Sequence, residues 1–137
     1  MLSPLLMLEA KDGESAQDLW QAAELCLKLG RITQSMQFAH RAVQKDSSLG
    51  NAYNAFYLDT LKLSAELYEE VGNFNNAVFY WQQLTKSSPQ NFEAWHGLGV
   101  ALANLENYGE AVAVLQNALK LQPQNQKVRD LLNQMRS

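Results

Sequence analysis

The acidic residues Glu66, Glu69 and Glu70 come closest, by type and spacing, to a cluster that could do chemistry. Spacings of three and four residues place them close together on one helix. A carboxylate metal site of the di-iron type also needs two Glu-x-x-His pairs, and the sequence contains only one, Glu93 and His96. We therefore expect an acidic surface, with no metal centre and no cofactor.

The other residues capable of chemistry are two histidines, His40 and His96, and the single cysteine, Cys26. One cysteine cannot form a disulfide framework or a cysteine-based zinc site. Cys26 lies on an apolar helix face, where we expect a buried and unreactive thiol. The sequence contains no Gly-x-Ser-x-Gly elbow, His-Glu-x-x-His motif or calcium loop. These observations predict that the protein is not an enzyme.

The composition fits one globular domain: 137 residues, 47% of them hydrophobic, with a net charge of −3. No stretch reaches the roughly 18 to 20 apolar residues of a membrane-spanning helix. The absence of a Lys/Arg cluster argues against nucleic acid as a partner. Residues 1–10 are apolar but lack the basic start and the length of a secretory signal, so we expect a short helix there and a cytoplasmic protein.

Shifting the sequence against itself by 34 residues reveals an internal repeat, with eight of 19 positions identical between residues 73–91 and 107–125. About one or two matches are expected from average residue usage. Each unit has the pattern of a helix, a short turn and a second helix. Gly97 and Gly99 fall inside a helix, where their small size permits close helix packing.

The pattern resembles the tetratricopeptide repeat (TPR). In the last two units the resemblance depends on Leu61, Ala65, Tyr68, Gly72, Phe74, Ala77, Trp81 and Pro89, and on Trp95, Leu98, Gly99, Leu102, Ala111, Leu115, Ala118 and Pro123. A weaker first unit carries Leu19, Ala23, Cys26, Gly30, Ile32, Ser35, Ala39 and Ala42. The resemblance implies an all-α fold, a right-handed α-solenoid of three TPR helix pairs.

We expect the three units at residues 16–49, 58–91 and 92–125, after an N-terminal extension at 1–15. The eight inserted residues 50–57 contain no proline, so they should lengthen the first helix of unit two to about residues 51–71.

Two further segments carry expectations of their own. Residues 126–137 should form a capping helix with one buried face. The aromatic residues Tyr53, Phe56 and Tyr57 of the insert either pack within the chain, against the N-terminal segment, or form a second contact surface. Self-association through residues 1–10 or 50–57 is a further possibility.

The resemblance also implies a concave groove lined by the first helix of each unit. Carried over by register, the predicted partner-binding residues are Trp20, Glu24, Leu27, Lys28, Asp59, Lys62, Glu66, Glu69, Glu70, Glu93, His96, Val100 and Asn104, with Gln17 and Ala103 beside them. Their six carboxylates and two lysines give a local charge of −4, against −3 for the whole chain. We therefore expect a basic protein or peptide partner with apolar anchors. Trp20 either serves as one such anchor or is covered by the N-terminal leucines.

The best-known TPR ligand mode, the clamp for the C-terminal carboxylate of Hsp70 and Hsp90, uses Lys, Asn and Arg. At the corresponding positions this chain has Trp20, Glu24, Leu63, Glu93 and Gly97, so a co-chaperone role is not expected. The expected function is a non-enzymatic protein-interaction module, an adaptor or assembly factor. Two alternatives are a small TPR chaperone like those of type III secretion, and the interaction domain of a larger enzyme such as a TPR-bearing glycosyltransferase.

Overall fold

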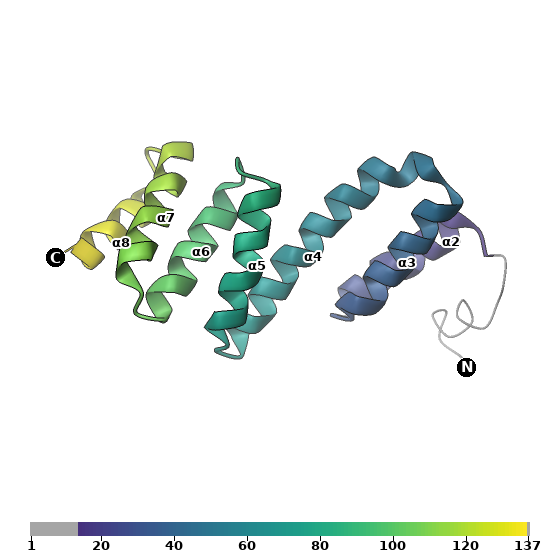
Figure 1. Ribbon diagram of the computed structural model, residues 1–137, viewed down its shortest axis with the longest axis horizontal. Helices are drawn as coiled ribbons and strands as arrows, with labels where there is room; N and C mark the ends of the chain where they lie inside the picture. The colour runs from purple at the N-terminus through teal and green to yellow at the C-terminus, as the bar shows by residue number, and fades with distance from the viewer. Residues whose placement is uncertain (1–13, 137) are drawn as a thin grey trace. The chain divides into compact units, whose positions relative to one another are not determined.

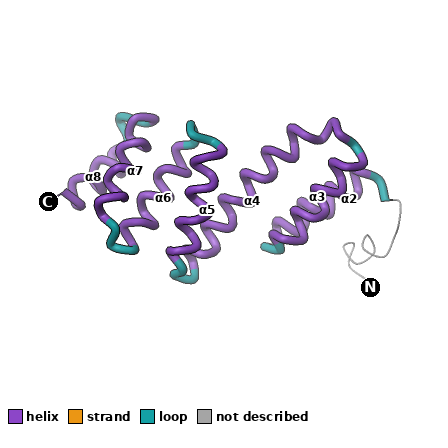
Figure 2. Tube along the Cα trace, viewed as in Figure 1, coloured by secondary structure: helices purple, strands orange, loops and turns teal. Residues whose placement is uncertain are grey.

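A computed structural model of the protein describes residues 14–136. The chain forms two compact units, Met1–Thr60 and Leu61–Ser137. From here on these two are called the first and the second unit, and the three repeat units are called repeats. Over the described residues it consists of seven α-helices and one short 3-10 helix, without a strand (Figures 1 and 2). In chain order these are α2 (Ala16–Lys28), α3 (Ile32–Lys45), η1 (Ser47–Leu49), α4 (Gly50–Glu70), α5 (Phe74–Ser87), α6 (Phe92–Asn104), α7 (Tyr108–Leu121) and α8 (Gln126–Arg136). The expected all-α fold is confirmed, while the short helix expected in residues 1–10 lies outside the described residues.

In the first unit α2 packs against α3. Leu19, Ala23 and Cys26 of α2 are fully buried in a core that also contains Phe38 and Ala39 of α3. The alanines let the two backbones approach closely, and the leucine and phenylalanine fill the space beside them. The expected burial of Leu19 and Cys26 is therefore confirmed.

The start of α2 is attached to α3 by a carboxylate that the sequence analysis did not single out. The side chain of Glu14 is only 3% exposed, and its Oε2 lies 3.6 Å from a guanidinium nitrogen of Arg41. Lys45 donates a hydrogen bond to the backbone carbonyl of Glu14. Ser15 then caps the helix by accepting from the backbone N–H of Asp18 at 3.0 Å.

Helix α4 runs unbroken through the inserted residues and spans 21 residues, as the absence of proline predicted. Phe56, from the insert, is only 6% exposed, and its ring lies 5.2 Å from that of Trp20 on α2. Tyr57 next to it is 37% exposed. Of the two alternatives for the insert, packing within the chain therefore applies to Phe56, because this ring is part of the core of the first unit.

In the second unit the helices pack in sequence order, α5 on α6, α6 on α7 and α7 on α8 (Figure 1). Two glycines of α6 mark the tightest approaches. A Cβ at Gly97 would lie 2.5 Å from the Trp81 ring, and one at Gly99 would lie 2.5 Å from Leu115. The packing role predicted for these glycines is confirmed.

Helix α8 covers the apolar side of the last repeat. Val128 and Leu132 are buried in a cluster with Leu115 and Ala118. The polar residues of α8, among them Arg129 and Asn133, are exposed. Helix α8 therefore has one buried face and one solvated face.

The two tryptophans that the repeat pattern assigns to the core differ in burial. Trp81 is buried, as predicted. Trp95 is only partly buried and packs at the margin of the α7–α8 cluster. Its indole N–H donates to the carbonyl of Pro89 at 2.8 Å. The position of Trp95 at the margin of the cluster lets its indole N–H reach a polar partner, which a fully apolar core would not supply.

The same turn follows the first helix of each repeat. Gly30 and Gly72 adopt the left-handed backbone conformation, with φ of 75° and 76°, and Glu106 occupies the equivalent position with φ of 61°. In each turn the next N–H, that of Arg31, Asn73 or Asn107, donates to the carbonyl five residues earlier. This is the Schellman motif, in which glycine is the favoured residue.

We expect Glu106→Gly to stabilise the protein. Glycine adopts a left-handed φ without the steric cost of a side chain, which is about 1 kcal/mol. Thermal unfolding followed by circular dichroism should show a Tm increase of about 3–5 °C. The control is Glu110→Gly, an exposed glutamate inside α7, where glycine should lower Tm because it weakens a helix. A Glu106→Gly protein that melts no higher than the parent would contradict the strain assigned to this turn.

Candidate functional site

The second unit contains a surface cavity of about 280 Å³ where α4, α5 and α6 meet. Its lining residues are Lys62, Glu66, Glu69, Trp81, Glu93, His96, Gly97 and Val100. Six of these eight, all except Trp81 and Gly97, belong to the predicted partner-binding set. Six residues of the set implied by the TPR resemblance therefore line one cavity, and their part in binding stays a prediction.

The cavity has an aromatic element, Trp81, that the sequence analysis assigned only to the core. The indole N–H of Trp81 donates to Glu69 Oε1 at 2.5 Å. Gly97 leaves room for the ring, since a Cβ there would overlap it. Trp81 thus fixes one carboxylate of the cavity and is itself held by the backbone of α6. Glu69 and Trp81 are 12 positions apart in the sequence, and a glutamate and a tryptophan at that spacing do not by themselves predict a hydrogen bond.

Burial raises the pKa of the Glu69 carboxyl. The hydrogen bond from Trp81 opposes this rise, and the neighbouring Glu66 carboxylate adds to it. Burial and the nearby Glu66 charge both disfavour the ionised form of Glu69, the first by removing water and the second by repulsion. A cation entering this space would relieve that repulsion.

Lys62 and Glu93 form an ion pair that links α4 to α6. Their side chains remain 40% and 63% exposed, so the pair is accessible to water. Exposed pairs of this kind contribute at most about 1 kcal/mol to stability. The ion pair therefore links α4 to α6 only weakly, so another charged group could replace either partner.

His96 contributes an apolar face to the cavity. Its ring stacks on that of Phe92, with centroids 5.7 Å apart and planes inclined by 10°. Burial lowers the pKa of His96, and the positive charge of Lys127 lowers it further. The lowered pKa favours the neutral imidazole at pH 7, and the cavity has three carboxyl groups against one ammonium group, a formal net charge of −2.

The other predicted partner-binding residues do not line this cavity. Five belong to the first unit, where Glu24, Lys28 and Asp59 are exposed and Trp20 and Leu27 are half-buried against the core. In the second unit Glu70 and Asn104 are exposed, and Asn104 donates its side-chain amide to the Val100 carbonyl at 3.0 Å. Their part in binding stays a prediction.

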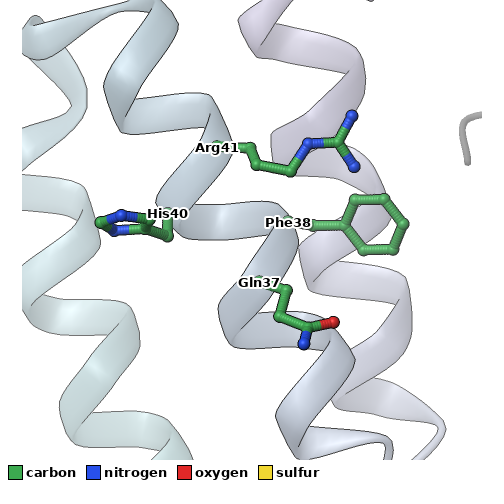
Figure 3. Close-up of a pocket in the computed structure, with 4 residues that line it drawn as sticks. All are labelled: Gln37, Phe38, His40 and Arg41. Atoms are coloured by element: carbon green, nitrogen blue, oxygen red, sulfur yellow. The ribbon is translucent and has the colours of Figure 1, made fainter. Parts of the chain in front are cut away.

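A second cavity, of about 350 Å³, lies on α3 in the first unit. Gln37, Phe38, His40 and Arg41 line it, and Figure 3 shows Phe38 and Arg41 extending to one side of α3 and His40 to the other. The Arg41 guanidinium lies 5.6 Å from the centre of the Phe38 ring and also pairs with Glu14. Arg41 is therefore already engaged by two groups of the first unit.

Within residues 14–136, no group of three or more His, Cys, Asp or Glu side chains is arranged to hold a metal ion. None of the described helices combines the length and the apolar character needed to cross a membrane.

Comparison with known proteins shows what this part of the chain is similar to. A family model described as tetratricopeptide repeat matches residues 63–126. This range includes seven of the eight cavity-lining residues, all but Lys62. Residues 63–126 are tetratricopeptide repeats. The cavity is thus formed largely by the first helices of two consecutive TPR repeats and the second helix of the earlier one.

Two of the similar proteins match this chain over most of its length. The Cell division cycle protein 27 homolog of Caenorhabditis elegans is 29% identical over 125 residues, 90% of this chain. The chain spans only 14% of the length of that relative. Among solved structures, the C-terminal TPR-containing domain of a Plasmodium falciparum protein matches with a TM-score of 0.61 and 20% identity, over 88% of this chain and 85% of that one.

The first TPR of Spaghetti (RPAP3), bound to the HSP90 peptide SRMEEVD, matches with a TM-score of 0.56 and 17% identity, over 90% of this chain and 92% of that one. At such identities, the structural likeness establishes the TPR fold and nothing finer.

Proposed function

We propose that the chain is a non-enzymatic protein-interaction module, an adaptor or assembly factor, that binds a basic segment of another protein in the cavity between α4, α5 and α6. The observation that supports the proposal most strongly is the net charge of −2 in a concave space with apolar walls at Trp81, His96 and Val100. Concave surfaces focus such a field and favour cationic segments on encounter. The apolar walls would take the stem of a long basic side chain or a neighbouring aliphatic residue.

The charge of the cavity also distinguishes this chain from its peptide-binding structural neighbour. The peptide bound by the first TPR of Spaghetti contains two glutamates and ends in an aspartate. Glu66, Glu69 and Glu93 would repel such a ligand, and the five positions compared with the carboxylate clamp carry no lysine, asparagine or arginine. We therefore propose a ligand of the opposite charge.

Trp20 and the carboxylates of the first unit remain candidates for a separate contact with the partner. Trp20 is half-buried on Phe56, so only part of its ring is available. Trp20→Ala should therefore weaken binding less than neutralising the cavity does.

Binding should be measured by calorimetry with a synthetic blocked octapeptide in which arginine and leucine alternate. The Glu66→Gln, Glu93→Gln double variant should bind it at least about fivefold more weakly at 50 mM NaCl, since each lost charge contact is worth about 0.5–1 kcal/mol. The difference should shrink at 300 mM NaCl because salt screens exposed charges.

The matched control is the Glu106→Gln, Glu110→Gln double variant, which makes the same change in net charge at two exposed positions outside the cavity. It should bind like the parent, and the peptide SRMEEVD should bind neither protein. Equal affinity and equal salt dependence in the cavity variant and the parent would show that this cavity is not the site.

A further inference from the structure

Helix α5 has an uncharged outer face with an aromatic ring at its centre. Phe79 is 52% exposed, more than any other Phe, Tyr or Trp side chain in the described part of the chain. Asn75 and Asn76 lie one helical turn before it, and Gln82 and Gln83 lie one turn after it. The asparagines are exposed and the glutamines are half-buried. Four amide side chains therefore surround the exposed ring on the same face of α5.

The Phe79 ring is held in place from one side. Its ring meets that of Tyr80 edge to face, with centroids 5.1 Å apart and planes inclined by 88°. Tyr80 in turn stacks on Tyr68 of α4, with centroids 5.7 Å apart. An ordered ring loses little conformational entropy when a partner covers it, which is typical of the aromatic residues that anchor protein interfaces.

The charge distribution of the sequence indicates what can cover this face. Residues 71–85 contain no charged side chain and form the longest uncharged stretch of the chain. Two copies of a chain with a net charge of −3 repel each other, and they are opposed least where the facing surfaces carry no charge. A two-fold symmetric interface also brings the same surface of both copies together, so that surface must complement itself. Amide side chains do so, because each carries both hydrogen-bond donors and acceptors.

We propose that a second copy of this chain docks on the outer face of α5, and that the two copies form a two-fold symmetric dimer with the two Phe79 rings in contact at the axis. Aromatic residues at the centre and few charges are typical of such interfaces. Trp81 is two residues from Phe79, about 200° away around the helix, so the cavity that Trp81 lines faces away from the dimer contact.

The dimer should be weak, because a single helix of 14 residues contributes most of the contact. Its area is below the standard value of about 800 Å² per partner, and we expect a dissociation constant between about 10 and 500 µM. Sedimentation velocity of the full chain over that concentration range should show the average mass rising from that of the monomer toward that of the dimer.

Charges placed at the axis test the symmetry of the contact. Phe79→Glu brings two carboxylates together, and Phe79→Lys brings two ammonium groups together, so each variant alone should remain monomeric. An equimolar mixture of the two variants should dimerise again, because opposite charges then meet at the axis. The Tm of each variant should stay within about 3 °C of the parent value, because Phe79 is largely exposed.

Two other exposed aromatic residues provide matched controls, Tyr108 in the second unit and Tyr57 in the insert. Tyr108→Glu and Tyr57→Glu add the same charge and should dimerise like the parent. Loss of the dimer in Tyr57→Glu but not in Phe79→Glu would assign self-association to the insert and overturn the proposal. A parent that stays monomeric throughout the concentration range would overturn it as well, as would a mixture of Phe79→Glu and Phe79→Lys that stays monomeric.

Salt separates this contact from the acidic cavity. Raising NaCl from 50 to 300 mM should not weaken the dimer, because salt screens the repulsion between two acidic copies and the contact itself carries no charge. The same change should weaken the binding of a basic peptide in the cavity. A dimer that dissociates as salt is added would show that charged groups form the contact, and would overturn the assignment to α5.

Discussion

A protein in which Val128 is replaced by aspartate should lose several kcal/mol of stability and expose apolar surface. Val128 is fully buried against Leu115 and Ala118, and an ionised carboxylate there would have no partner. We expect the Tm to fall by more than about 10 °C. The variant should also bind a hydrophobic dye such as ANS and elute partly as aggregates in size-exclusion chromatography.

The matched control is Asn133→Asp, which adds the same charge to the exposed face of α8. It should melt within about 2 °C of the parent, as exposed substitutions usually do. Deletion of residues 126–137 should reproduce the effect of Val128→Asp, because each repeat is stabilised by its neighbour. A truncated chain that stays monomeric with an unchanged melting curve would show that α8 does not cap the last repeat.

The second large effect is expected at Gly99. An alanine Cβ there would lie 2.5 Å from both Cγ and Cδ2 of Leu115, which is fully buried. Either α6 and α7 must separate or Leu115 must leave its rotamer, at a cost of about 1–3 kcal/mol. Thermal or urea unfolding of Gly99→Ala should show this loss.

Gly109 provides the comparison, because a Cβ at Gly109 would meet nothing within 4 Å. Gly109 lies inside α7, so Gly109→Ala should raise stability by about 0.5–1 kcal/mol through helix propensity alone. Opposite signs for the two glycine-to-alanine changes would establish close helix contact as the cause. A neutral Gly99→Ala would mean that α6 and α7 do not pack as tightly as described.

The helices could be predicted from the sequence because their causes are local and repeated. The 34-residue period, the apolar spacing and Pro123 define α6 and α7, and the absence of proline in residues 50–57 predicts the length of α4. The same reasoning placed Leu19, Cys26 and Trp81 in the core, since a repeat position fixes which side of a helix is covered.

What the sequence did not reveal depends on contacts between particular atoms of separate helices. The hydrogen bond from Trp81 to Glu69 requires the ring to lie against Gly97, and the pair of Lys62 with Glu93 requires two long side chains to meet. Repeat register predicts which side a residue faces but not which neighbour it touches. For that reason six of the eight residues that line the cavity belong to the predicted set, while the pairing between them could not be predicted.

The position of Trp81 gives the cavity an optical reporter. Its indole N–H bonds to Glu69, whereas Trp20 lies on Phe56 and Trp95 bonds to the Pro89 carbonyl. A guanidinium that approaches Glu69 changes the electric field at one of the three fluorophores and leaves the surroundings of the other two as they were. Binding in the proposed site should therefore be visible by intrinsic fluorescence without a label, and a Trp81→Phe protein provides the blank.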